Sequence, residues 1–252
     1  MARQARKKSE TGIYHVIFRG INKQNIFEDD EDREKFLGTL KYYKGLCNYL
    51  LYGYCLMDNH IHLLIKEKDE TISQVVKRIS ASYVNWYNEK YERCGHLFQE
   101  RFKSEVVEFE EYFLIVLRYI HQNPVKAGIT QNVSNYLWSS YHEYDDQPYL
   151  IDIAFGLDVF SNVREKAINL FKDYTDERNR DECLDYQARA AKSDEEVMLF
   201  LNELGIENIS QLQQMNKTER DAAIRSIKAK DNITVRQLAR ITGISKSLIA
   251  RL

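Results

Sequence analysis

Hydrophobic and polar residues follow two different periods along the first half of this chain. Four short stretches are rich in apolar residues that alternate with polar ones or run without interruption, which predicts β-strands. These strands are expected at residues 13–19, 49–57, 60–66 and 104–109. Three longer stretches place apolar residues three or four positions apart, which predicts helices at 29–47, 71–91 and 110–122. The order of short strands and interleaved helices predicts an α+β fold with a ferredoxin-like antiparallel sheet.

The second half of the chain has a different pattern. Residues 149–192 turn polar and acidic around 176–185, and we interpret them as a helical connector. From residue 193 onward the pattern is purely helical, and it begins with a capping box from Ser193 to Glu196. The expected domains are therefore 1–148 with the sheet, 149–192 as the connector, and 193–252 as a helical C-terminal domain.

Residues 233–252 have the pattern of a helix-turn-helix. A helix, a glycine turn and a second helix capped by Ser245 follow one another. Between residues 217 and 252, nine Lys and Arg residues stand against three Asp and Glu residues, so this segment is locally basic. DNA contact by Arg236 and Lys246 is the functional interpretation, and a plain helical hairpin is the alternative. The helix after Ser245 is short for a recognition helix, so the completeness of the C-terminus stays open.

Composition and charge limit the classes of function. With 36 Lys and Arg against 38 Asp and Glu, the formal net charge is −2, which argues against a globally basic nucleic-acid binder. The N-terminal arm at residues 1–11 is locally basic and contains Arg3, Arg6, Lys7 and Lys8. It is interpreted either as a frayed terminus or as a contact to phosphates. The four cysteines lack CxxC spacing, which argues against a zinc ribbon or a disulfide framework and indicates a cytoplasmic protein. No signal peptide or membrane-length apolar run is present, so no membrane partner is expected.

His60 and His62 are the first candidates for chemistry. Side chains on a strand alternate between its faces, so both imidazoles and Leu64 share one face of the strand at 60–66. Two imidazoles at this spacing suit one metal ion. The alternative is a pair of ordinary core histidines, and the motif HxH alone does not decide between the two.

The helix expected at 110–122 supplies the second half of this candidate site. At about 100° per residue, Tyr119 and Asn123 lie together on one flank of its apolar face. Arg118 is expected to point to solvent. Pro124 is expected to end the helix, because the residue before a proline is disfavoured in the α region. A phenol and an amide would then stand one turn apart at the end of a helix.

Several longer motifs connect the two halves of the site. The segments GYCLMDNHIHLLI, LFQERFKS and YIHQNPVKAGI together resemble the REP-associated tyrosine transposases and the wider single-tyrosine HUH transposase family. RGINKQNIF and WSSY also fit, and the resemblance extends from residue 1 to about 145. The helical C-terminus lies outside the common core of that family.

The resemblance implies a metal-dependent endonuclease and strand transferase that acts on single-stranded DNA. His60 and His62 would be metal ligands and Asn123 the third ligand. Tyr119 would be the nucleophile that forms a covalent phosphotyrosine. These ligands are neutral and leave the ion its full charge, and Mg²⁺ or Mn²⁺ is expected. Tyr112 is a rival nucleophile near the same flank, but Asn123 neighbours Tyr119 and not Tyr112.

Single-stranded DNA with a hairpin beside the cut is the expected partner of a monomer or homodimer. Gln99, Arg101 and Lys103 are candidate DNA contacts, with ordinary surface solvation as the alternative. Two other functions share parts of the pattern. One is a non-catalytic DNA-binding regulator that uses the helix-turn-helix. The other is a rolling-circle initiator or relaxase, which would usually work with a helicase, and the chain has no GxxxxGK motif followed by Ser or Thr.

Overall fold

The chain forms two compact units, Met1–Tyr186 and Gln187–Leu252, which are described separately. The computed structural model describes residues 6–145, 148–185, 192–230 and 233–252. Arg3 of the basic N-terminal arm therefore lies outside the described residues.

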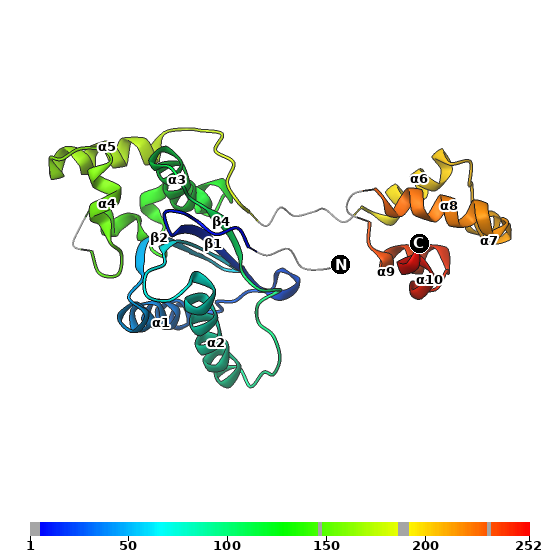
Figure 1. Ribbon diagram of the computed structural model, residues 1–252, viewed down its shortest axis with the longest axis horizontal. Helices are drawn as coiled ribbons and strands as arrows, with labels where there is room; N and C mark the ends of the chain where they lie inside the picture. Colours follow the sequence, from blue (N-terminus) through cyan, green and yellow to red (C-terminus); the bar gives the residue numbers. More distant parts are fainter. Residues whose placement is uncertain (1–5, 146–147, 186–191, 231–232) are drawn as a thin grey trace. The chain divides into compact units, whose positions relative to one another are not determined.

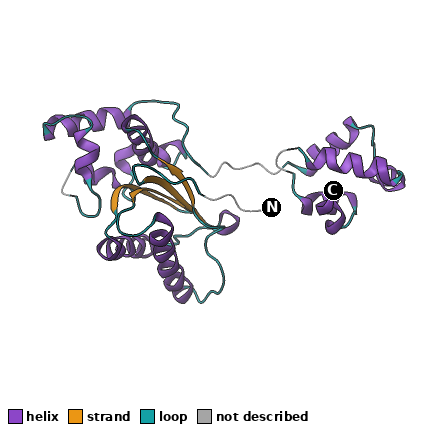
Figure 2. Ribbon diagram, viewed as in Figure 1, coloured by secondary structure: helices purple, strands orange, loops and turns teal. Residues whose placement is uncertain are grey.

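The first unit is built on a four-stranded antiparallel sheet with the strand order β2-β3-β1-β4. The strands are β1 (Ile13–Arg19), β2 (Leu50–Met57), β3 (His60–Lys66) and β4 (Lys103–Val106). They lie side by side in Figure 2, where they are orange. The predicted α+β fold with an antiparallel sheet is confirmed. The last strand is shorter than predicted, because it ends at Val106 and not at residue 109.

Three helices cover the two faces of this sheet. They are α1 (Asp30–Cys47), α2 (Ile72–Lys90) and α3 (Glu110–Lys126). Figure 1 shows α1 and α2 on one face and α3 on the other. Ring contacts join the first pair to the sheet, since the Phe36 ring centroid lies 6.3 Å from that of Phe18 and 5.1 Å from that of Tyr83.

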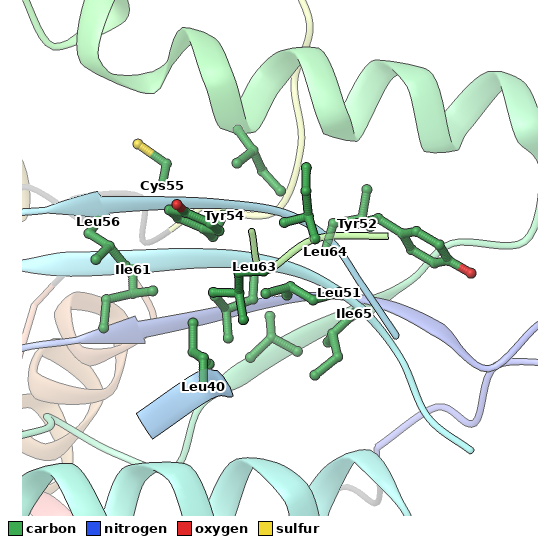
Figure 3. Packing of buried hydrophobic residues seen from close by; sticks show 14 of the residues in the cluster. Leu40, Leu51, Tyr52, Tyr54, Cys55, Leu56, Ile61, Leu63, Leu64 and Ile65 are labelled. Atoms are coloured by element: carbon green, nitrogen blue, oxygen red, sulfur yellow. The ribbon is translucent and has the colours of Figure 1, made fainter. Parts of the chain in front are cut away.

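β2 and β3 form the buried centre of the sheet. Their apolar side chains point to both faces, with Leu63 and Ile65 on the side of Leu40 and with Cys55 and Leu64 on the opposite side (Figure 3). All five side chains are 0% exposed. The continuous apolar sequence of these strands follows from this arrangement, because helices cover both faces and each buried side chain of this size contributes about 1.5–3 kcal/mol.

Gly53 of β2 allows α3 to approach the sheet closely. A Cβ atom at this position would lie 2.8 Å from Leu117 Cδ1 and 3.6 Å from Ser140 Oγ. The hydroxyl of Ser140 in turn contacts His121 Nε2 of α3 at 2.8 Å. The absence of a side chain at Gly53 therefore sets the distance between α3 and the sheet.

α3 differs from the sequence prediction in two respects. It continues beyond Pro124, which was expected to end it. Proline removes only one N–H, and the next turn is held by Ala127, whose N–H donates to the carbonyl of Asn123 at 2.9 Å. The prediction of a solvent-exposed Arg118 was wrong. Arg118 is buried, and its Nε donates to Asp181 at 2.8 Å.

The chain after α3 runs beside the edge strand β2, where the N–H of Leu56 donates to the carbonyl of Trp138 at 2.8 Å, and then returns to α3. Its regular elements are η2 (Val133–Asn135), η3 (Ser140–Tyr144), α4 (Ile153–Asp158) and α5 (Arg164–Asp176), while η1 (Ile21–Lys23) follows β1. Residues 177–185 have no regular secondary structure. Glu177 and Asp181 from this segment pair with Arg118 at 3.1 and 2.8 Å, which fixes the segment against α3.

The second unit is helical throughout its described residues. It contains α6 (Asp194–Glu203), α7 (Ile209–Gln214), α8 (Lys217–Lys228), α9 (Val235–Thr242) and α10 (Lys246–Arg251). Leu201, Ile224, Leu238 and Ile249 are each 0% exposed and form its core. Gly243 takes the left-handed conformation, with φ of 69°, between α9 and α10. In the described part of the chain, no helix has the length and apolar character needed to span a membrane.

Candidate active site

A cavity of about 530 Å³ opens where the ends of β1, β3 and α3 meet. The residues lining it that carry functional groups are Arg19, Asn25, Asp58, Asn59, His60, Tyr119, Asn123, Lys126 and Asp185. The cavity therefore brings together residues predicted from two separate motifs.

The histidine pair lies on the face of the sheet that α3 covers. The ring centroids of His60 and His62 are 5.0 Å apart. His62 is fully buried, and its Nδ1 lies 2.9 Å from Nε2 of His15 on β1. His60 Nδ1 donates to Oδ1 of Asn59 at 2.7 Å. Both rings are thus held through Nδ1, and Nε2 of His62 is a buried nitrogen without a hydrogen-bond partner among the described residues.

α3 carries the phenol and the amide to the same place. The ring of Tyr119 lies 5.9 Å from that of His62, centroid to centroid. The carboxamide of Asn123 lies beside His60, and its Nδ2 donates to the main-chain carbonyl of Tyr119 at 2.9 Å. This bond directs the amide nitrogen to the helix, so the amide oxygen is the acceptor that remains available.

Burial controls the charge of the imidazoles. It lowers the pKa of His62 well below the ordinary value, and the nearby rings of His60 and His15 lower it further. Burial also lowers the pKa of His15, to about 3. The pKa of His60 is lowered by burial as well, although the carboxylate of Asp185 acts in the opposite direction. These histidines are therefore neutral at physiological pH, which is the form that binds metals.

Tyr119 lies in an environment that disfavours its phenolate. Burial raises the pKa of Tyr119, and the charge and hydrogen bond of Asp185 raise it further. Lys126 acts in the opposite sense, because its Nζ lies 4.6 Å from the centre of the Tyr119 ring. Burial lowers the pKa of Lys126, while the carboxylate of Asp181 acts in the opposite direction.

The donor set fits a divalent cation. Nε2 of His62 is orphaned, the amide oxygen of Asn123 is available, and His60 is oriented through its other nitrogen. Hydrogen bonds of this kind to the second ring nitrogen are typical of metal-binding histidines. Within the described ranges, no group of three His, Cys, Asp or Glu side chains has an arrangement that could hold a metal ion, so an ion here would depend on Asn123 as its third ligand.

The remaining predicted residues lie elsewhere. Tyr112 does not line the cavity, and its hydroxyl donates to Glu105 at 2.7 Å. Gln99, Arg101 and Lys103 line a separate cavity of about 570 Å³. Of the second unit, Arg236 on α9 and Lys246 at the start of α10 are both exposed.

The sequence analysis missed four residues that belong to this environment. They are His15, Arg19, Lys126 and Asp185. His15 and Arg19 had a detectable signal, because they are polar residues at alternate positions of the predicted strand 13–19 and so share one face. Asp185 had none, since it lies in an acidic segment without periodicity.

The comparisons with known proteins match the part of the chain that contains most of this cavity. Residues 8–123 match the family model "Transposase IS200 like". A protein of Haemophilus influenzae described as a REP-associated tyrosine transposase is 26% identical over 115 residues, which cover 40% of this chain and 65% of that protein. The chain therefore matches somewhat less than two thirds of the length of this relative.

Two solved structures are also similar to this chain. One is a REP-associated tyrosine transposase bound to a REP hairpin, with 17% identity and a TM-score of 0.49 over 62% of this chain and 97% of that one. The other is a crystal structure described as a transposase from Deinococcus radiodurans, with 16% identity and a TM-score of 0.34 over 53% of this chain and 97% of that one.

Proposed function

Residues 8–123 of this chain form an IS200-like transposase domain, and from this premise we propose that the protein cuts and rejoins single-stranded DNA through a covalent phosphotyrosine. The observation that carries the proposal is the shared cavity. His60 from the HxH motif and Tyr119 and Asn123 from α3 line the same opening, although the two segments lie far apart in sequence. A non-catalytic DNA-binding protein has no need of an orphaned imidazole nitrogen facing a tyrosine.

Tyr119 is the nucleophile in this proposal. Its Oη attacks phosphorus and forms the O–P bond, and the bond between phosphorus and the leaving 3′-oxygen of the DNA breaks. Asp185, whose carboxylate lies beside the phenol, accepts the phenolic proton, and the leaving 3′-oxygen takes a proton from water to become a 3′-hydroxyl. Lys126 stabilises the developing phenolate from a position over the ring. Attack by a free 3′-hydroxyl reverses the reaction and joins a new strand.

A divalent cation, Mg²⁺ or Mn²⁺, would be held by His60, His62 and Asn123. When bound, the ion supplies Lewis-acid polarisation of the scissile phosphate. The protein residues orient this site beforehand. His15 holds the orientation of the His62 ring through its Nδ1, and the side-chain oxygen of Asn59 does the same for His60.

DNA contacts outside the cavity follow from the charged surfaces. We propose Gln99, Arg101 and Lys103 as contacts for the single strand, with a hairpin beside the cut. Exposed Arg236 and Lys246 on the paired helices α9 and α10 support a helix-turn-helix contact to duplex DNA. We propose that the protein acts in the cytoplasm as a monomer or a homodimer.

The test is a denaturing-gel assay for a covalent protein–DNA adduct. Hairpin oligonucleotides with single-stranded flanks, taken from the DNA beside the gene, are incubated with Mn²⁺ or Mg²⁺. Wild type should form a metal-dependent adduct, Tyr119→Phe should form none, and the matched variant Tyr112→Phe should behave as wild type. An adduct that persists in Tyr119→Phe and disappears in Tyr112→Phe would assign the nucleophile to the rival residue. DNA binding without an adduct on any hairpin would support the regulator instead.

A further inference from the structure

A cavity of about 400 Å³ lies under the segment that joins α2 to β4. We call it the aromatic cavity. It is lined by Arg6, Phe18, Ser73, Lys77, Ser80, Phe98, Glu100, Arg101 and Phe102. Its rings come from β1 and from the joining segment, and α2 closes it with small polar residues and one lysine. None of these residues lines the cavity that contains Tyr119.

Three phenylalanines give the aromatic cavity its shape. The ring of Phe18 is buried and lies 5.2 Å from that of Phe98 and 6.4 Å from that of Phe102, centroid to centroid. Phe98 and Phe102 are only partly buried, so part of each ring is accessible from the cavity. Partly exposed rings around an opening are the arrangement that proteins use to stack unpaired bases.

The rim of the aromatic cavity is basic. Arg6 lies flat on Phe102, with the guanidinium carbon 3.7 Å from the ring centre, and it also donates to the carbonyl of Phe102 at 2.8 Å. Burial lowers the pKa of Arg6, and the charge of Arg101 lowers it further, so the two guanidinium groups repel each other. With Lys77, these groups place three cations around one carboxylate, that of Glu100. An anion between the two arginines would relieve the repulsion.

The aromatic cavity is continuous with the surface that leads toward Tyr119. The cavity that contains Gln99 and Lys103 is also lined by Arg6, Arg101 and Phe102, and it reaches Leu184. Asp185, the next residue, lines the cavity of Tyr119. A strand that follows the basic groups therefore has a path from the proposed cutting site to the aromatic cavity.

We propose that the aromatic cavity receives one unpaired nucleobase of the single-stranded DNA, stacked on Phe98, which is partly exposed and not covered by Arg6, while Arg6 and Arg101 hold the neighbouring phosphate. The proposal rests on the proposed function and deepens it, because it locates a contact to the substrate away from the cut. The class of ligand follows from the chemistry of the cavity, which offers aromatic faces to a flat ring and cations to a phosphate.

The test compares two probes that differ only in their bases. One is a fluorescein-labelled oligothymidine of about 15 nucleotides, and the other has the same length but carries abasic residues. The affinity of the full-length protein is measured by anisotropy in EDTA, so that no cutting occurs. Wild type should prefer oligothymidine by about tenfold, from a stacking contribution of ~1–3 kcal/mol per base. Phe98→Leu should lose this preference, and Tyr42→Leu, at an exposed ring on α1, should keep it.

A second variant separates the phosphate from the base. Arg101→Gln, at an exposed position, should weaken binding of both probes equally and reduce the salt dependence while keeping the preference for bases. The inference is overturned if Phe98→Leu folds and retains the preference of wild type, or if wild type has no preference. Because the adduct assay is independent of these probes, an adduct formed by a protein without base preference would remove this inference and leave the proposed function intact.

Discussion

The substitution Gly53→Ala tests whether close packing of α3 on the sheet assembles the active site. The added Cβ would lie 2.8 Å from Leu117 Cδ1, whereas ordinary contact begins at 3.4 Å, so the two atoms must separate by at least 0.6 Å (3.4 − 2.8). Leu117 is only 1% exposed and has little room to rotate. Overpacking of this kind costs about 1–3 kcal/mol. It outweighs the ~0.4–1 kcal/mol that alanine gains by restricting the unfolded chain.

Tryptophan fluorescence during urea unfolding reports the free energy of unfolding of the first unit, which contains Gly53. The chain has two tryptophans, Trp86 and Trp138, and both belong to the first unit. The matched control is Gly38→Ala in α1, where an added Cβ meets no atom within 4 Å. Alanine is favoured over glycine inside a helix by about 0.5–1 kcal/mol. The same substitution should therefore destabilise the unit at Gly53 and stabilise it at Gly38.

Gly53→Ala should lower both stability and activity, whereas Gly38→Ala should leave activity unchanged. A displacement of α3 carries Tyr119 and Asn123 away from the histidines on β3, and misplacement by 1 Å can cost about a hundredfold in rate. We expect Gly53→Ala to form the covalent adduct about tenfold more slowly under conditions where it is folded. A Gly53→Ala variant with the stability and adduct rate of wild type would refute the reasoning that this glycine seats the helix.

Three further predictions concern single groups. His15→Leu should weaken Mn²⁺ binding, measured by electron paramagnetic resonance, by about tenfold or more because His62 loses its orienting partner, and His15→Gln should restore part of it. Asp185→Asn should lower the pKa of Tyr119, since it removes the charge that opposes the phenolate, and an unshifted alkaline limb in the pH profile of adduct formation would contradict this. Burial lowers the pKa of His121 to about 3, below its unfolded value of about 6.5. The neutral ring therefore contributes stability above about pH 6.5 that is lost as the pH falls toward its folded pKa. Urea unfolding at about pH 7 and 5 measures the free energy of unfolding that is lost on acidification. This loss should be smaller in His121→Gln than in wild type, by about 1.4 kcal/mol per pH unit below about pH 6.5, and an equal loss in both proteins would exclude this role.

The order and type of the four strands and of α1, α2 and α3 followed from periodicity, whereas η2, η3, α4 and α5 were not predicted as separate elements. The strands around His60 and the three helices all have apolar patterns that local geometry explains. Tertiary partners were not predictable in the same way. Arg118 lies at a solvent-facing position of a helical wheel, and its burial depends on Asp181, a residue 63 positions away in a segment without periodicity.

The candidate site was predictable to the extent that its residues share a short-range geometry. His60 and His62 are related by the strand period, and Tyr119 and Asn123 by the helical turn, so each pair could be read from the sequence. The contact between the pairs depends on packing of α3 over Gly53, which no local pattern records. The residues that tune the chemistry, such as Asp185, come from a third segment that only the folded chain brings near.

The continuation of α3 through Pro124 bears on how precisely Asn123 can act. If the helix had ended at the proline, the amide would stand in a fraying final turn, where backbone carbonyls lack partners. Instead, the carbonyl of Asn123 accepts from Ala127, and its side chain donates to the carbonyl of Tyr119. Each of these bonds ties the amide to the same helical turn that carries Tyr119. The proposed ligand and the proposed nucleophile therefore move as one body relative to the histidines, so the separation between α3 and β3 is the main geometric variable of the site.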